Sequence, residues 1–112
     1  MELKPRMHND VAIITIPGDH LDAGNVKEFK RDIVPLLETH KQIVFDMSEL
    51  RFVDSSGLGA ILSCLRQLNA TGGDVKLASL SKGVRALFEL VRMHRIFDIY
   101  NSADEAAQAY SA

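Results

Sequence analysis

Short runs of β-branched and apolar residues alternate along this chain with longer segments whose apolar residues recur at the helical period. The strand-like runs are residues 11–16, 43–45 and 75–78, and the helical periods begin at Val26, Leu58 and Val84. Helical segments of this length typically connect one parallel strand to the next. The alternation therefore predicts an α/β domain with a mixed sheet of four to five strands and about four helices.

The N-terminal segment adds an antiparallel edge to this sheet. Residues 3–7 are a weak strand candidate, and Pro5 favours an edge position for it. Asn9 and Asp10 form a short turn signal before the strand over residues 11–16. Two short strands joined by two turn residues predict a hairpin.

Cap residues mark the expected helix ends. Asp22 is the expected N-cap of the first helix, and Pro35 predicts a kink or an early end just before it. Ser81 is expected to cap the third helix. Ser102 and Glu105 form a capping box that opens a short C-terminal helix.

Three segments are expected to be connectors or short extended pieces. Residues 19–24 read as a polar loop, and residues 50–53 as a connector with Leu50 and Phe52 pointing inward. Residues 96–100 are expected to form a final short strand or extended segment.

Length and composition narrow the class of protein. A chain of 112 residues is expected to be one domain over residues 1–112, and it can bury enough surface to fold without a metal or disulfide. The formal net charge is −2 with no block of Lys and Arg, so neither nucleic acid nor an anionic membrane is favoured as a partner. Cys64 is the single cysteine, the N-terminus has no apolar signal core, and no apolar stretch is long enough to span a membrane. We expect a soluble cytoplasmic protein.

The junction before the second helix carries the chemistry. Asp54 precedes two adjacent hydroxyls, Ser55 and Ser56, and two glycines follow at Gly57 and Gly59. The junction lies on the carboxyl side of a predicted central strand, where open α/β sheets hold their functional sites. The first N–H groups of the helix would stabilise a phosphate on Ser55. That phosphate would add about −1.5 to −2 charge beside Asp54 and so change any docking surface there.

A plain capping role competes with this interpretation. On residue type alone, Asp and Ser at a helix start are more often caps than regulatory sites. Gly57 and Gly59 argue against capping alone, because each weakens the helix and together they indicate close approach by a strand or another protein. Leu58 between them fits either an outward apolar anchor or a core position.

The junction resembles the motif of the STAS domain family, in its branch of bacterial anti-sigma-factor antagonists. The residues that carry the resemblance are Leu50-x-Phe52-x-Asp54-Ser55-Ser56-Gly57-Leu58-Gly59. Supporting similarities are Gly18-x-x-Leu21-Asp22-Ala23, Leu87-Phe88-Glu89-Leu90 and Arg95-Ile96-Phe97. The chain departs from the family at Arg92, where relatives often have a glycine, and this leaves the turn over residues 92–94 open.

The resemblance implies a partner-switching regulator without enzymatic activity or cofactor. An unmodified antagonist of this family binds an anti-sigma factor that is also an ATP-dependent serine kinase, and so frees the sigma factor. The kinase phosphorylates the first serine of the motif, which is Ser55 here, and a metal-dependent phosphatase restores the binding form. By the same resemblance, Asp22 borders a docking surface that includes Asp54, Ser55, Ser56, Gly57, Leu58 and Gly59.

Three alternatives stay open at the level of sequence. The chain could be a STAS subunit of a lipid-transport ATPase complex or of a stress-signalling scaffold. It could be a small serine-dependent enzyme, although Ser55 is not in a nucleophile elbow and no His is linked to it by spacing. Asp19, His20 and Asp22 resemble metal ligands in type, but no second group completes a site, and a solvated loop is the favoured interpretation.

Overall fold

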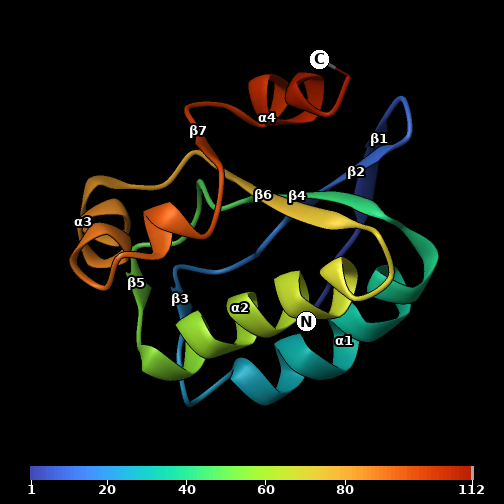
Figure 1. Ribbon diagram of the computed structural model, residues 1–112. Coiled ribbons are helices and arrows are strands. Elements are labelled where there is room, and N and C mark those ends of the chain that lie inside the picture. Colours follow the sequence, from blue (N-terminus) through green and yellow to red (C-terminus); the bar gives the residue numbers. More distant parts are fainter. Residues whose placement is uncertain (112) are drawn as a thin grey trace.

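The computed structural model describes residues 1–111, which build a five-stranded mixed sheet between two layers of helices (Figure 1). The strands lie in the order β1 (Pro5–His8), β2 (Val11–Thr15), β4 (Gln42–Asp46), β6 (Asp74–Ala78) and β7 (Ile99–Tyr100). β1 pairs with β2 in antiparallel fashion at the edge, and the remaining neighbours are parallel. The predicted α/β class and the N-terminal hairpin are confirmed.

Alternation along the strands divides the interior into two layers. Ala12 and Ile14 of β2 join the main core beneath α1 (Val26–Thr39) and α2 (Ser55–Asn69). Val11 and Ile13 of the same strand face the other way and join the layer under α4 (Ala103–Ala109). Successive side chains of a strand point to opposite faces, so a continuously apolar strand serves two layers at once.

The central strand β4 is buried on both faces. Ile43 and Phe45 lie in the main core, whereas Val44 lies in the second layer, and all three are fully buried. Phe45 also packs edge to face on Phe29 of α1, with ring centroids 5.9 Å apart. Burial of this kind is worth roughly 1.5–3 kcal/mol for each large side chain, so β4 and α1 anchor the fold.

The second layer is thin, because α4 presents alanines to the sheet. Ala103, Ala106 and Ala107 are buried there. The hydroxyl of Tyr110, just after α4, donates toward the carbonyl oxygens of Ile43 and Asp74, each 2.8 Å away. These bonds fix the C-terminal helix over the sheet.

Two short strands outside the main sheet correct the sequence prediction. β3 (His20–Leu21) and β5 (Phe52–Val53) pair in parallel, where the sequence predicted a polar loop and a connector. The register opposes Leu21 to Val53, and both are buried. Because neighbours in a strand point to opposite sides, Phe52 faces outward and is 55% exposed, so its predicted inward orientation is wrong. Leu50 is buried as predicted.

The first helix differs from its prediction at its start and near Pro35. Its N-cap is Asn25, not Asp22, and no side chain caps it. α1 also continues through Pro35 to Thr39, so the predicted early end is wrong. Pro35 and Arg31, whose carbonyl loses its partner, are both exposed. Water can therefore satisfy that carbonyl, which removes the main reason for the helix to stop.

The other helix starts follow their predicted caps. Ser81 Oγ accepts from Val84 N–H at 3.3 Å before α3 (Lys82–Leu90), and Ser102 Oγ accepts from Glu105 N–H at 3.1 Å before α4. α3 ends in a turn that leads to the 3-10 helix η1 (Met93–Arg95). The last strand is shorter than predicted, since only Ile99–Tyr100 of residues 96–100 pairs with β6.

Candidate functional site

The predicted junction forms the start of α2, where a second loop packs against it. β5 leads directly into Asp54, and α2 begins at Ser55. The loop between β3 and α1 reaches the same place in space, because β3 pairs with β5. We call residues 22–24 and 54–59 together the α2-start surface.

Asp54 holds the two halves of this surface together. Its Oδ1 accepts from Gly57 N–H at 2.9 Å, which caps the helix, and its Oδ2 accepts from Ala23 N–H at 3.0 Å. These donors, that of Gly57 foremost, hold the pKa of the Asp54 carboxyl below its ordinary value. The carboxylate is therefore ionised at neutral pH and braces the loop against the helix. The capping role that the sequence left open for Asp or Ser at this helix start belongs to Asp54.

Ser55 is the exposed member of the serine pair. It occupies the first helical position and its side chain faces solvent, whereas Ser56 is partly buried. Within residues 1–111 the Ser55 hydroxyl makes no hydrogen bond to another residue. A modifying enzyme can therefore reach this oxygen without opening the fold.

The two glycines of the junction have different surroundings. A Cβ on Gly57 would overlap the carbonyl oxygen of Leu21 and lie 2.9 Å from Cγ1 of Val53. A Cβ on Gly59 would meet nothing within 4 Å. The close approach indicated by the sequence is thus internal at Gly57, whereas Gly59 leaves an open surface. Leu58 is 8% exposed and belongs to the main core, which decides between its two possible orientations.

Asp22 lies in the loop half of the surface. Its Oδ1 accepts from Gly24 N–H at 2.9 Å, and its own N–H donates to Asn25 Oδ1 at 2.9 Å. The carboxylate therefore shapes the turn before α1 and stays partly exposed beside Ala23.

His20 is a neighbour that the sequence did not single out for this surface. Its Nδ1 lies 3.0 Å from Asp19 Oδ1, and its Nε2 lies 4.0 Å from Asp22 Oδ1. The hydrogen bond to Asp19 and the charge of Asp22 raise the pKa of His20. In the part of the chain that the structure describes, no group of three His, Cys, Asp or Glu residues is placed to bind a metal ion.

The hydrogen bond from Ala23 to Asp54 was not predicted from the sequence. Ala23 contributes a backbone N–H, so its residue type carries no signal. The contact exists because the pairing of β3 with β5 brings the loop to Asp54.

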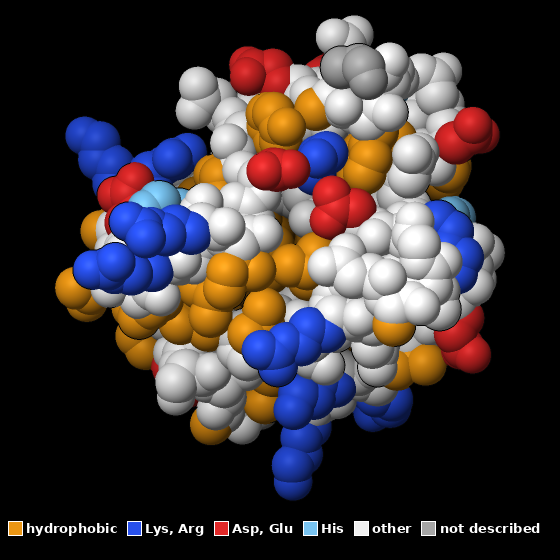
Figure 2. All heavy atoms as spheres, viewed as in Figure 1, with side chains coloured by type: hydrophobic (Ala, Val, Ile, Leu, Met, Phe, Trp, Pro, Cys, Tyr) orange, Lys and Arg blue, Asp and Glu red, His pale blue; other side chains and the backbone are white. Residues whose placement is uncertain are grey.

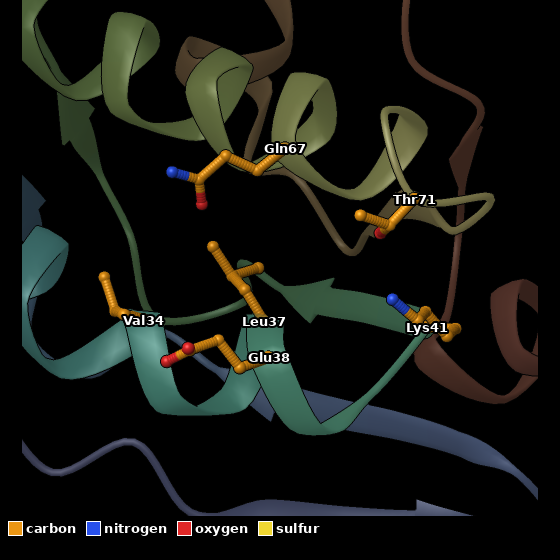
Figure 3. Close-up of a pocket in the computed structure, with 6 residues that line it drawn as sticks. All are labelled: Val34, Leu37, Glu38, Lys41, Gln67 and Thr71. Carbon is orange, nitrogen blue, oxygen red and sulfur yellow. The ribbon is translucent and has the colours of Figure 1, made fainter.

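One surface groove lies outside the α2-start surface. It measures about 500 Å³ and lies between α1 and α2. Figure 3 shows Val34 and Leu37 of α1 pointing toward α2, and Gln67 of α2 pointing back. None of residues 54–59 lines it. A second groove of about 350 Å³ lies between β5 and α3, next to the junction.

Cys64 is a packing residue of α2. It is buried in the main core, and burial raises the pKa of its thiol to about 12. None of the helices among residues 1–111 combines the length and the apolar character that crossing a membrane requires.

Comparisons with known proteins agree on the family. The model of the STAS domain matches residues 2–106. The anti-sigma-B factor antagonist of Bacillus subtilis is 26% identical over 100 residues, which cover 89% of this chain and 90% of that protein.

Solved structures match over almost the whole chain. The crystal structure of the protein TM1081 from Thermotoga maritima superposes with a TM-score of 0.89 at 26% identity and covers 98% of this chain and 95% of that one. The anti-sigma factor antagonist SpoIIAA in its unphosphorylated form has the same fold, with a TM-score of 0.80 at 23% identity over 98% of this chain and 96% of that one. The match of the family model over residues 2–106, together with the shared fold, shows that this chain belongs to the STAS domain family.

Proposed function

We propose that this chain is an anti-sigma factor antagonist, a binding module that phosphorylation at Ser55 switches off. In the unphosphorylated form, the α2-start surface binds an anti-sigma factor that is also an ATP-dependent serine kinase. Phosphorylation releases that partner, and a serine/threonine phosphatase restores binding. The protein acts as a binding module and not as an enzyme, in the cytoplasm, where sigma factors work.

One observation carries the proposal: Ser55 is an exposed hydroxyl at the first position of a helix whose start is braced to a neighbouring loop. The relatives of this chain support the same function, since the Bacillus subtilis protein is named an antagonist of an anti-sigma factor. No observation on this chain favours a lipid-transport complex, a scaffold subunit or a hydrolase.

The physical effect of a phosphate differs between the fold and the surface. The helix start carries a partial positive charge, and Ser55 contributes nothing to the core, so the fold tolerates the group. On the surface, the phosphate adds about −1.5 to −2 charge beside the ionised Asp54. A partner fitted to the neutral hydroxyl and to the open face at Gly59 loses both shape and charge complementarity.

The site assignment is tested by phosphorylation with the anti-sigma factor kinase of the same organism and ATP, followed by mapping of the phosphate by mass spectrometry. We expect one phosphate on Ser55, none on the Ser55→Ala protein, and normal labelling of Ser56→Ala. Full phosphorylation of Ser55→Ala would refute the assignment.

The switch itself is tested with a charge mimic. Ser55→Asp is expected to weaken binding to the unmodified kinase while the melting temperature stays nearly unchanged. Ser63→Asp is the matched control, because Ser63 is an exposed serine further along α2. A large fall in melting temperature specific to Ser55→Asp would mean that Ser55 serves the helix start alone.

A further inference from the structure

Exposed apolar side chains gather around α3. Six large apolar residues are exposed within residues 1–111, namely Met7, Val34, Phe52, Leu90, Val91 and Ile96. Four of the six lie on β5, on α3 or in the segment that follows α3. Leu90 is 80% exposed, more than any other in this group. Single exposed apolar residues are ordinary, but a group of them around one element marks an interaction surface.

A groove gives this group a concave centre. It lies between β5 and α3, with Phe52 and Val53 on one wall and Val84 and Leu87 on the other. Gly83 also lines it, and a Cβ there would meet nothing within 4 Å, so this part of the groove stays open. Leu87 and Leu90 are three residues apart on α3 and so lie on one face of the helix. The groove can accept one large apolar side chain.

The same region is basic in an acidic protein. Residues 82–95 hold four Lys or Arg and one Glu, a net charge of +3, whereas the whole chain has a formal net charge of −2. None of these four cations forms an ion pair with the residues that the structure describes. Figure 2 shows Lys and Arg side chains gathered over the α3 side of the molecule, next to hydrophobic ones. Arg51 adds a fifth cation, in the groove wall. Cations that form no ion pair with the described residues are complementary to an acidic partner.

The groove is continuous with the α2-start surface. Val53 lines the groove and lies two residues before Ser55, a chain distance of at most about 7 Å. Phe52 pairs in register with His20, which contacts the loop half of that surface. A protein that covers Ser55 therefore also reaches the groove.

We propose that Phe52, Leu87, Leu90 and Val91, with Arg51 and the basic residues of 82–95, form a second contact area for the anti-sigma factor. We call it the α3 surface. It takes an acidic segment of that partner, with one large apolar side chain in the groove between β5 and α3. This inference rests on the proposed function. A protein segment suits the α3 surface better than a membrane does, because two of its apolar residues, Phe52 and Leu87, line a concave groove next to the start of α2.

The test measures the affinity of the unphosphorylated chain for the anti-sigma factor kinase by calorimetry, at low and at high salt. Leu90→Glu is expected to weaken binding by about tenfold or more, since a buried apolar anchor dominates such contacts. The matched control is Val34→Glu, an exposed apolar residue of α1, with an expected change within about twofold.

Charge is tested separately with the double variant Lys82→Glu and Arg95→Glu. It is expected to weaken binding and to flatten the salt dependence, because screening no longer removes an attraction. The control is Lys41→Glu with Arg66→Glu, two exposed cations outside the α3 surface. All variants are expected to keep the wild-type melting temperature, since none of the altered side chains is buried.

The outcomes separate the two proposals. Suppose that wild type binds the kinase and is phosphorylated normally, and that Leu90→Glu and the Lys82/Arg95 variant bind with unchanged affinity. This result would overturn the α3 surface and leave the proposed function intact. Absence of any binding by wild type would overturn the proposed function and this inference with it. Sedimentation of wild type with phosphatidylglycerol vesicles, lost in Leu90→Glu, would assign the surface to a membrane and overturn it as a protein contact.

Discussion

Gly57, in the first turn of α2, lies against the carbonyl oxygen of Leu21, with no space between them for a side chain. The same carbonyl accepts from Asp54 N–H at 3.3 Å. This close contact lets β3 lie beside the start of α2 and brings Ala23 within 3.0 Å of the Asp54 carboxylate. The shape of the α2-start surface therefore depends on Gly57, because only a residue without a side chain fits beside Leu21.

The two glycines of the junction should respond in opposite directions to alanine. Gly57→Ala is expected to lower the free energy of unfolding by about 1–3 kcal/mol, because the added methyl group must displace the Leu21 backbone or the Val53 side chain. Gly59→Ala has open space and should raise it by up to about 1 kcal/mol through helix propensity. Urea denaturation measures both. Equal effects would contradict the difference in packing.

Gly59→Ala also separates stability from binding. A methyl group at Gly59 lies on the open face of the α2-start surface. We expect a more stable protein that binds the anti-sigma factor more weakly, measured by calorimetry on the purified pair. Unchanged binding would place Gly59 outside the docking surface.

Asp54 should make stability depend on pH in the acid range. Its folded-state pKa is lowered from an ordinary value of 3.8, chiefly by the N–H of Gly57 and with a further contribution from that of Ala23. The lowered value means that its contribution is fully present above about pH 4 and is lost as the pH falls through the folded-state pKa. Asp54→Asn keeps a capping oxygen but does not titrate.

The comparison is made by thermal unfolding of wild type and Asp54→Asn between pH 7 and pH 2. Wild type should melt higher at neutral pH, and the two curves should converge as the pH falls. A constant difference across the range would mean that the Asp54 charge does not stabilise the junction.

The sequence was sufficient for elements that many residues specify together. The helical periods of α1, α2 and α3 and the β-branched run of β2 each repeat a pattern over several turns or alternations. The caps at Asp54, Ser81 and Ser102 were predictable because a side-chain oxygen at a helix start has a local partner two or three residues on. The same local geometry does not choose between Ser55 and Ser56, which both lie in the first turn, and the choice of Ser55 came from the resemblance to the STAS motif.

Contacts between segments that are distant in the sequence could not be predicted from local patterns. β3 and β5 have two residues each, too few for a period, and their pairing decides that Val53 points inward and Phe52 outward. Ala23 contacts Asp54 through its backbone N–H, and such a contact cannot be predicted from the residue type. Pro35 was expected to kink α1 or end it early, but α1 continues through Pro35, which lies on the exposed side of the helix. In each case the tertiary environment outweighed a local rule.

Cys64 should resist thiol reagents in the folded protein. Burial raises the pKa of its thiol to about 12, so at pH 8 almost none of it is thiolate and the sulfur is also inaccessible. We expect slow labelling by a chromogenic disulfide at pH 8, and rapid labelling of one thiol per chain in denaturing urea. Labelling of the folded protein at the rate of a free thiol would contradict burial of Cys64 in the main core.

Arg92 should be a position at which glycine is better than the native residue. It has φ of +63°, the left-handed conformation that favours glycine, at the turn between α3 and η1. This conformation costs a residue with a Cβ about 1–2 kcal/mol of folding free energy. Glycine avoids that cost, but part of its advantage is offset because glycine has more conformational freedom in the unfolded chain. Arg92→Gly is therefore expected to gain about 0.5–1 kcal/mol in urea denaturation. Arg92→Ala removes the same charge but keeps the strain, so it should gain nothing, and equal stability of the two variants would show that the turn stores no strain.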